Sequence, residues 1–570
     1  MVKGIKIMDF AKLKLIGNVE SVDTGSVIVK IEKEEFLNNL QVNNIVAIRS
    51  SKTGEKIIGI IIKIMKKMLD EIDNENPEEQ IIQNVIRVNL IGTFLDKYGE
   101  KENVFKRTLE TVPSINADCF LVDGDELSNF MQSLTLNQDS TNSLNIGKYT
   151  ISADADAYLD GNKFFQRHAV IVGSTGSGKS WTVATILEKA TQLPSVNCLI
   201  FDIHGEYRPL KKLNNTTLLK IAGPIDTEDS DNLIFLPYWL LTYEEIGAML
   251  LDRSDNNAPN QARILFDLII KYKKEILENE EQQKVLNNFT IDSPIPYDIN
   301  KVLRELEDKD MEMVPGANNR QKQGPLHGKL TRFIQRLKSK QSDKRLNFIF
   351  NGSENLQEYN WFQTLVNKLM DFGNTKGCKI IDFSEVPSDI LPLITGLIAR
   401  IVFSVQQWME ENKRHPLALF CDEAHLYIPS QVRNSIEERG LYNFERIAKE
   451  GRKYGLSLVV ISQRPADVSK TILSQCGNFI AMRLSNPDDQ NVIKRLFPDT
   501  LSNFAELLPI LDIGESLAVG DACLLPSRIR IHIPTIKPNS ATVDFWDEWQ
   551  KKKKEKGLVQ AVENLRKQGR

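Results

Sequence analysis

The first part of the chain alternates short apolar runs with turn signals, a pattern that is typical of a small β domain. The apolar runs cover residues 13–21, 26–31, 43–49 and 56–64. Gly-, Asn- and Asp-containing turns separate them at 23–25, 38–39 and 53–54. An acidic break at 70–80 precedes one more apolar run, at 81–94, which can close a barrel. We therefore predict a small N-terminal β-barrel over residues 1–110 and a connection over residues 111–150.

From about residue 160 onward, short buried strands alternate with stretches of helical periodicity. The strand candidates are residues 169–172, 197–202, 379–383, 417–422, 456–462, 479–484 and 516–525. This alternation predicts an α/β domain over residues 151–540, with a parallel sheet covered by helices on both faces. Between 240 and 374 the pattern turns helical with long polar loops, which indicates a helical insertion. Residues 541–570 form a charged tail with helical periodicity, including the run Lys551-Lys-Lys-Lys554.

Composition places the chain among ordinary soluble proteins of two or three domains. Apolar residues make up 41% and charged residues 26% of the 570 positions. The net charge of −4 excludes a protein coated in basic charge, although basic groups confined to a pore remain compatible with nucleic acid. The six cysteines show no metal-ligand spacing, which favours buried thiols in a reducing cytoplasm. The longest apolar stretch, 390–405, contains Arg400 and is too short to span a bilayer, so we expect a cytoplasmic protein without a membrane segment or signal peptide.

A complete phosphate-binding loop connects the first strand of the α/β domain to a helix. Residues 173–180 read Gly-Ser-Thr-Gly-Ser-Gly-Lys-Ser and lie between an apolar strand and a helical stretch. Glycines let successive backbone N–H groups face phosphates, and the helix adds its positive dipole end. The motif predicts that Lys179 reaches the β/γ-phosphates of ATP and that Ser180 ligates Mg²⁺. The predicted nucleotide-binding residues are Gly173, Ser174, Thr175, Gly176, Ser177, Gly178, Lys179 and Ser180.

Adjacent carboxylates end the strand at 417–422. Asp422 is placed to hold the shell of Mg²⁺, and Glu423 to polarise the attacking water as general base. The alternative is a buried strand that meets an acidic helix start. His425 either relays a change of state or packs, and we favour packing or a supporting contact to the site residues. Asp202 and Glu206, after the second strand, could assist the metal shell, although Asp202 could equally cap a turn.

The strand at 456–462 delivers Gln463 to its carboxyl end, where ligands bind in open α/β sheets. We therefore expect Gln463 to sense the γ-phosphate and orient water; a polar turn is the alternative. Hydrolysis also needs positive charge on the transition state, often an arginine from a neighbouring subunit. The candidates, in order of preference, are Arg452, Arg167 and Arg446.

These motifs together resemble the HerA family of hexameric DNA translocases and helicases, within the FtsK–HerA group of P-loop motors. Besides Arg167-His168 and the phosphate-binding loop, the matching segments are residues 202–207, 422–425, 450–455, 462–465, 486–490 and 514–534. They follow the family's order over about residues 165–535. One departure is Lys449, where the family usually has arginine, and this leaves open which basic residue acts as the trans finger.

The resemblance implies a RecA-like ATPase core in a homohexameric ring that uses ATP and Mg²⁺ to move double-stranded DNA. It also implies that the N-terminal barrel docks a partner, either a nuclease of the NurA type or another kind, or a sirtuin-type effector. Relatives with such partners act in DNA end processing or in anti-phage defence.

Two functions remain open at this point. For a DNA translocase, the segment 320–345, with nine Lys or Arg against one Asp, is a candidate DNA contact, although a solvated helical face is the more common explanation of such a segment. For a scaffold ATPase, the ring would organise a partner enzyme without moving DNA processively. A helicase with two motor domains is disfavoured because no second core follows, and a protein unfoldase because no aromatic pore motif stands out.

Overall fold

The computed structural model describes residues 9–38, 40–72, 80–99, 101–136, 143–151, 155–252, 254–315, 321–371, 377–497, 499–540, 544–551 and 557–567. Arg320, at the start of the basic segment, and residues 552–554 of the lysine run lie outside these ranges. The chain forms two compact units. The first contains Met1–Ala190, Gln463–Ala466 and Cys476–Thr535, and the second contains Thr191–Ser462, Asp467–Gln475 and Ile536–Arg570.

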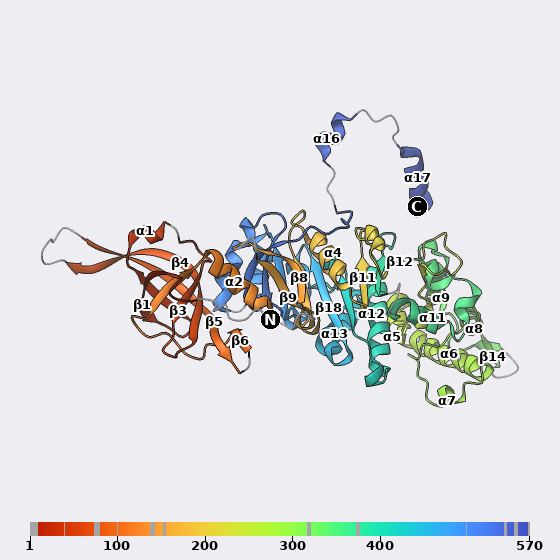
Figure 1. Cartoon of the computed structure of the whole chain (residues 1–570). Coiled ribbons are helices and arrows are strands. Elements are labelled where there is room, and N and C mark those ends of the chain that lie inside the picture. Colours follow the sequence, from red (N-terminus) through yellow and green to blue (C-terminus); the bar gives the residue numbers. More distant parts are fainter. Residues whose placement is uncertain are drawn as a thin grey trace. The chain divides into compact units, whose positions relative to one another are not determined.

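The N-terminal part of the first unit is a closed barrel of six antiparallel strands, as the sequence predicts (Figure 1). Around the barrel the strands follow the order β2-β1-β7-β3-β4-β5, and pairing of β5 with β2 closes it. The strands are β1 (Lys14–Val22), β2 (Ser26–Ile31), β3 (Ile45–Arg49), β4 (Glu55–Ile72), β5 (Gln80–Tyr98) and β7 (Asp118–Val122). β6 (Lys101–Lys106) adds to β5, and α1 (Glu34–Leu37) follows β2. β7 lies in the stretch that the sequence suggests is a connection, and it pairs with both β1 and β3.

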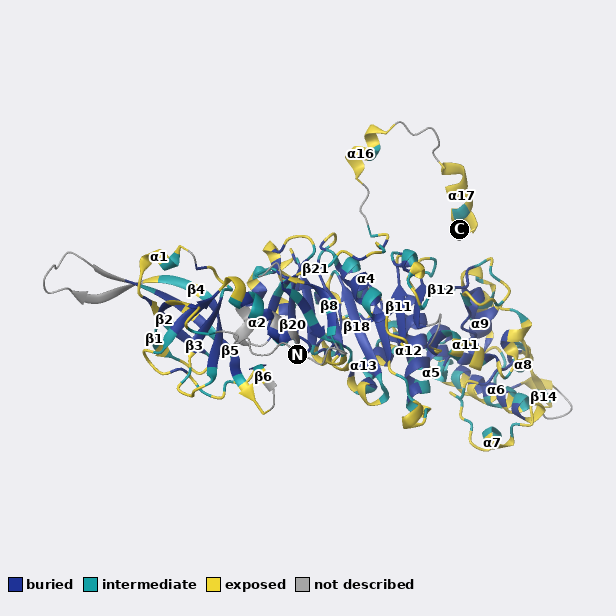
Figure 2. Ribbon diagram, in the orientation of Figure 1, coloured by how far each residue is buried: buried dark blue, intermediate teal, exposed yellow. Residues whose placement is uncertain are grey.

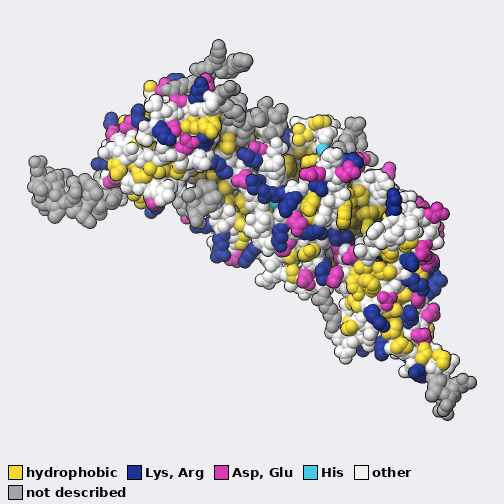
Figure 3. All heavy atoms as spheres, turned by 90° about the horizontal axis from the view of Figure 1, so that it is seen from below, with side chains coloured by type: hydrophobic (Ala, Val, Ile, Leu, Met, Phe, Trp, Pro, Cys, Tyr) yellow, Lys and Arg dark blue, Asp and Glu magenta, His cyan; other side chains and the backbone are white. Residues whose placement is uncertain are grey.

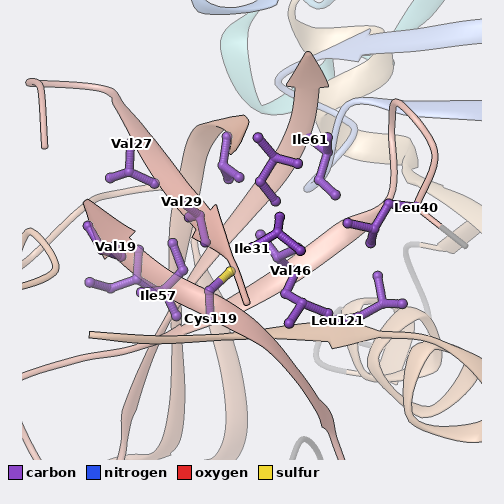
Figure 4. Close-up of a cluster of buried hydrophobic side chains, with 14 of the residues drawn as sticks. Val19, Val27, Val29, Ile31, Leu40, Val46, Ile57, Ile61, Cys119 and Leu121 are labelled. Atoms are coloured by element: carbon purple, nitrogen blue, oxygen red, sulfur yellow. The ribbon is translucent and has the colours of Figure 1, made fainter. Parts of the chain in front are cut away.

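The barrel interior is filled by aliphatic side chains from alternate strand positions. Figure 4 shows them gathered between the strands, with Cys119 among them. Alternation of buried and exposed positions is the period-2 pattern expected of strands with one face in a core. Burial raises the pKa of the Cys119 thiol. All six cysteines are buried and unbridged, in line with the prediction from their spacing.

The first unit also holds the strand that leads into the phosphate-binding loop. β10 (Ala169–Val172) pairs in parallel with β19 (Asn478–Met482), from which an antiparallel series runs β20-β21-β8-β9. These are β20 (Glu515–Gly520), β21 (Ser527–Ile531), β8 (Ser143–Tyr149) and β9 (Asp156–Asp160). The helices of this unit are α2 (Gly124–Leu136), α3 (Gly161–Gln166), α4 (Lys179–Ala190) and α15 (Pro487–Leu496).

The second unit is built on a parallel sheet in the order β13-β12-β16-β11-β17-β18. Its strands are β13 (Leu233–Ile234), β12 (Thr216–Ile221), β16 (Cys378–Asp382), β11 (Cys198–Asp202), β17 (Leu417–Cys421) and β18 (Leu456–Ser462). Figure 2 shows β11 and β18 as buried ribbons. Near-continuous apolar runs are what strands buried on both faces require, and the burial patterns of β11, β17 and β18 are buried throughout. The predicted α/β class is therefore confirmed.

Helices cover this sheet and form the predicted insertion. The insertion contains α5 (Tyr243–Leu250), α6 (Ala258–Asn279), α7 (Gln283–Leu286), α8 (Ile299–Met311), α9 (Thr331–Ser342), α10 (Asn347–Phe350) and α11 (Trp361–Met370), with a small hairpin, β14 (Met313–Pro315) and β15 (Gln321–Gln323). Outside it lie α12 (Leu391–Trp408), α13 (Ser435–Glu450), α14 (Lys470–Gln475), α16 (Phe545–Gln550) and α17 (Leu558–Lys567).

α12 is the central helix of the second unit. It is long and apolar enough to cross a membrane, but 72% of that stretch is buried in the protein, as in the core helix of a folded domain. Arg400 on this helix pairs with the buried Glu245 of α5 at 2.9 Å. α12 also packs closely on α13, because a Cβ on Gly396 would lie 2.6 Å from the Cα of Gly440. Two glycines thus let the helix backbones meet.

Candidate active site

The phosphate-binding loop of the first unit has the geometry that its glycines predict. β10 ends at Val172 and α4 begins at Lys179, so the loop opens directly onto a helix N-terminus. Gly176 has φ +74° and Gly178 φ +110°, backbone conformations that only glycine adopts without strain. A Cβ on Gly173 would lie 2.4 Å from the Oγ of Ser177. The loop therefore needs glycine at these positions for its shape alone.

Hydrogen bonds fasten this loop to the segments that follow β19 and precede β20. Ser174 N donates to the carbonyl of Arg483 at 2.8 Å, and Gly514 N donates to the carbonyl of Ser177 at 2.9 Å. Within the described part of the chain, the N–H groups of Gly176 and Gly178 donate to no protein acceptor. Outward-facing amides before a helix N-terminus form an anion-binding concavity. The loop is thus rigidly held and able to bind phosphate.

Two further side chains of the loop bear on nucleotide binding. Lys179 is only 8% exposed, so its ammonium is largely withdrawn from solvent. The buried Oγ of Ser177 has no hydrogen-bond partner among the described residues. An unsatisfied buried hydroxyl calls for an explanation such as an absent ligand or water.

Thr175, by contrast, is exposed and donates through Oγ1 to Oε1 of Gln463 at 2.8 Å. The predicted γ-phosphate sensor therefore contacts the phosphate-binding loop itself.

The acidic pair of the second unit follows β17 in a strained turn. Asp422 is 4% and Glu423 8% exposed, and Glu423 has φ +43° and ψ +45°. A left-handed conformation at a residue other than glycine costs roughly 1–3 kcal/mol and persists only where surrounding contacts impose it. Here the Tyr427 hydroxyl donates to the carbonyl of Asp422, and Leu426 N donates to the carbonyl of Glu423, both at 2.9 Å. The turn holds two carboxylates at the carboxyl end of β17.

Negative charge accumulates around this turn. Burial raises the pKa of Asp422 well above its usual range, and the charges of Glu423, Asp202 and Glu206 raise it further. Burial also raises the pKa of Asp202 to about 7, although backbone N–H groups that it accepts oppose the shift. Those bonds, from Glu206 N and Tyr207 N at 2.9 Å each, show that Asp202 caps the turn after β11. Buried carboxylates of this kind are stabilised by a cation.

The two predicted Mg²⁺ residues, Asp422 and Ser180, are each of suitable chemistry for that ion. No group of three or more His, Cys, Asp or Glu with metal-binding geometry occurs in the described ranges. Mg²⁺ in nucleotide sites takes only one or two protein ligands and fills its octahedron with water and phosphate oxygens. The buried Asp422 carboxylate and the Ser180 hydroxyl at the start of α4 are ligands of the right chemistry. They remain the predicted Mg²⁺ residues.

The side chain of His425 contacts Glu423, the predicted general base. Its Nδ1 lies 3.3 Å from Oε2 of Glu423 and 3.3 Å from Oγ of Ser462. The sequence signal for this contact was weak, because Ser462 is the last residue of another strand. Tyr427, which holds the turn, carried no sequence signal beyond being aromatic.

The three arginine candidates differ sharply in their surroundings. Arg446 on α13 donates to Gln407 at 3.1 Å, and its guanidinium lies 4.4 Å from the ring centroid of Phe403. Arg167 precedes β10 at the end away from the phosphate-binding loop and pairs with Asp521 at 3.5 Å. Arg452 is exposed on a 3₁₀ turn, and its guanidinium bonds to none of the described residues. Arg452 alone presents an uncommitted cation.

Charges of both signs share the protein surface. On the face that Figure 3 shows, Lys and Arg side chains are interspersed with Asp and Glu, and neither sign covers it. This agrees with the near-neutral net charge of −4.

Two family models match consecutive parts of the chain and together cover more than half of it. The Helicase HerA central domain matches residues 144–402, and the Helicase HerA-like C-terminal domain matches residues 406–526. A probable helicase of Methanocaldococcus jannaschii is 24% identical over 91% of this chain and 94% of its own. The DNA double-strand break repair helicase HerA of Saccharolobus solfataricus is 26% identical over 68% of each chain. Among solved structures, VirB4 of Thermoanaerobacter pseudethanolicus superposes with a TM-score of 0.47 at 14% identity, covering 71% of this chain and 98% of that one.

Proposed function

The chain belongs to the HerA helicase family, and we propose that it is a ring-forming ATPase that hydrolyses ATP to move double-stranded DNA. The observation that carries this proposal is the phosphate-binding loop, whose Gly176 and Gly178 amides precede α4 and donate to no acceptor among the described residues. Such a loop binds a triphosphate, and a helicase uses the energy of triphosphate hydrolysis to act on nucleic acid.

In this proposal the loop residues bind ATP and Glu423 acts as general base. The amides and Lys179 stabilise charge on the phosphates, and Ser180 with Asp422 holds Mg²⁺, which when bound neutralises phosphate charge. Glu423 accepts a proton from the attacking water, for which a buried carboxylate is suited. Gln463, whose amide oxygen accepts from Thr175, donates from its NH2 group to the γ-phosphate and orients the water.

We further propose a homohexamer in which Arg452 of one subunit stabilises charge at the nucleotide of the next. Support comes from its exposure and the absence of a bond to the described residues. Arg167 and Arg446 are weaker candidates because each already has a partner within the chain. The N-terminal barrel is the proposed docking surface for a nuclease or a sirtuin-type effector, in a cytoplasmic role in DNA end processing or anti-phage defence.

Three variants test the nucleotide chemistry. Lys179→Ala removes the phosphate-binding ammonium and should weaken ATP binding, whereas Glu423→Gln should keep ATP bound and stop its hydrolysis. Lys189→Ala, in the last turn of the same helix α4, is the matched control and should leave both unchanged. ATP binding is measured by equilibrium titration and hydrolysis by phosphate release. Normal turnover of Glu423→Gln would show that another group is the base.

A further inference from the structure

Three side chains at the carboxyl ends of β17 and β18 form a short chain of contacts that reaches the predicted general base. The two strands pair in parallel, so their carboxyl ends meet at one edge of the second unit's sheet. Glu423 Oε2 and Ser462 Oγ each lie 3.3 Å from the same atom, Nδ1 of His425; the contact with Ser462 has hydrogen-bond geometry, and the contact with Glu423 Oε2 is an ion-pair distance without it. Ser462 is completely buried, and the side chain of His425 is only 13% exposed.

The chemistry of these groups restricts what Nδ1 can do. An ionised carboxylate only accepts hydrogen bonds, so Nδ1 must carry a proton when it bonds to Glu423. A serine hydroxyl can accept that same N–H. Because Nδ1 carries one hydrogen, a well-aligned bond to Glu423 competes with one to Ser462. The arrangement is a single donor between two acceptors.

We propose that His425 is a positioning residue that orients the Glu423 carboxylate, and that Ser462 competes for its N–H. Ser462 is joined to Gln463 by one peptide bond. Gln463 in turn accepts a hydrogen bond from Thr175 of the phosphate-binding loop. The inference rests on the proposed function, in which Glu423 is the base and Gln463 the sensor.

The backbone of Glu423 supports this role. At φ +43° the residue is held in a conformation that an unconstrained glutamate rarely adopts. Its backbone is fixed by the bond from Leu426 N to its carbonyl. His425, two residues further along the same turn, places Nδ1 3.3 Å from the carboxylate.

Kinetics of four substitutions test the proposal. His425→Ala should lower kcat for ATP about tenfold or more while KM for ATP stays within about threefold, since the base is misplaced and the binding residues are intact. His425→Asn places an amide N–H near the position of Nδ1 and should restore kcat to within about threefold of the original protein. Ser462→Ala removes the competing acceptor, so alone it should raise kcat about twofold or more, and it should have no further effect in the His425→Ala background. Ser457→Ala, a buried serine on the same strand β18, is the matched control and should leave kcat unchanged.

Three results would overturn the proposal: an unchanged kcat in His425→Ala, no recovery in His425→Asn, or an effect of Ser462→Ala that persists in the double variant. Thermal melting establishes that each variant is folded. If His425→Ala does not fold, Ser462→Ala decides alone, and a kcat equal to that of Ser457→Ala contradicts the proposal. If the unaltered protein hydrolyses ATP and Glu423→Gln does not, yet His425→Ala is normal, only this inference fails. If Glu423→Gln remains active, both this inference and the assignment of Glu423 as the general base are wrong.

Discussion

The hydroxyl of Thr175 donates a hydrogen bond to the side-chain oxygen of Gln463 at 2.8 Å. The bond joins the phosphate-binding loop to the residue that follows β18. It engages the amide oxygen of Gln463, so the NH2 group is the part of this side chain that would donate to a phosphate in the proposed function.

We expect Gln463→Ala to lower kcat by about tenfold to a hundredfold with little change in ATP affinity, because water is no longer oriented while the phosphates are still bound. Steady-state phosphate release and nucleotide titration measure the two effects. Loss of ATP binding in this variant, or an unchanged kcat, would contradict the role of Gln463 as a γ-phosphate sensor.

Arg452→Ala should abolish turnover while the protein keeps its ATP affinity and thermal stability, because the exposed guanidinium contributes to a neighbouring site and not to its own fold. Mixing Arg452→Ala subunits with Lys179→Ala subunits should restore part of the activity. At some interfaces an intact loop then meets an intact arginine. Phosphate release across mixing ratios measures this, and a mixture no more active than its components would contradict action between subunits.

Arg446→Ala provides the comparison for that experiment. Its guanidinium lies over the ring of Phe403 and bonds Gln407, so its loss should destabilise the fold by about 0.5–2 kcal/mol. Turnover below the melting temperature should be largely kept. Chemical denaturation separates this structural effect from the catalytic effect expected at Arg452.

The buried ammonium of Lys273 should make stability depend on pH. Burial lowers its pKa to about 7, and it donates to the carbonyls of Ile291 and Ser293. Between about pH 7 and 10 the unfolded chain then binds one proton that the folded protein does not, so stability rises with pH over this window. Lys273→Met should remove that rise. Melting temperatures at pH 7 and 9 measure it.

Lys274→Met is the control for this effect, because the Lys274 side chain on the same helix is 57% exposed. Its melting temperatures should follow the pH dependence of the unaltered protein. If the melting temperature of Lys273→Met depended on pH in the same way as that of the unaltered protein, the Lys273 ammonium would not be desolvated.

Because α12 and α13 lie so close together, a single methyl group added between them should destabilise the protein. A Cβ on Gly440 would lie 2.3 Å from the carbonyl oxygen of Pro392, so Gly440→Ala should cost about 1–3 kcal/mol of stability. Gly247→Ala in α5 is the matched control: its Cβ would meet only Leu251, at 3.5 Å, and alanine favours the helix. Denaturant unfolding compares the two, and equal stability would contradict the tight packing.

The apolar patterns in the sequence predicted the exact bounds of some strands and missed other strands. β10 and β18 are bounded as expected, because apolar runs that end in glycine or polar residues define a buried strand. β7 and β8 were missed because residues 111–150 have no strong period and these strands depend on distant partners, β7 on β1 and β3, and β8 on β21.

The same distinction applies to the site. The phosphate-binding loop follows from eight consecutive residues, whose glycines fix its shape. The contact of His425 with Ser462 depends on the register of two parallel strands, and the contact of Arg446 with Phe403 depends on how α13 packs on α12. Such pairs depend on tertiary structure, so residue type and spacing did not predict them.

The most direct test of a DNA-moving ATPase is the rate of ATP hydrolysis with and without linear duplex DNA, over a range of salt concentrations. We predict that duplex DNA stimulates turnover, that salt weakens this stimulation because phosphate contacts release counterions, and that Glu423→Gln abolishes it. Turnover that is indifferent to duplex DNA at every salt concentration would contradict the account, and would favour a ring that organises a partner enzyme without moving DNA.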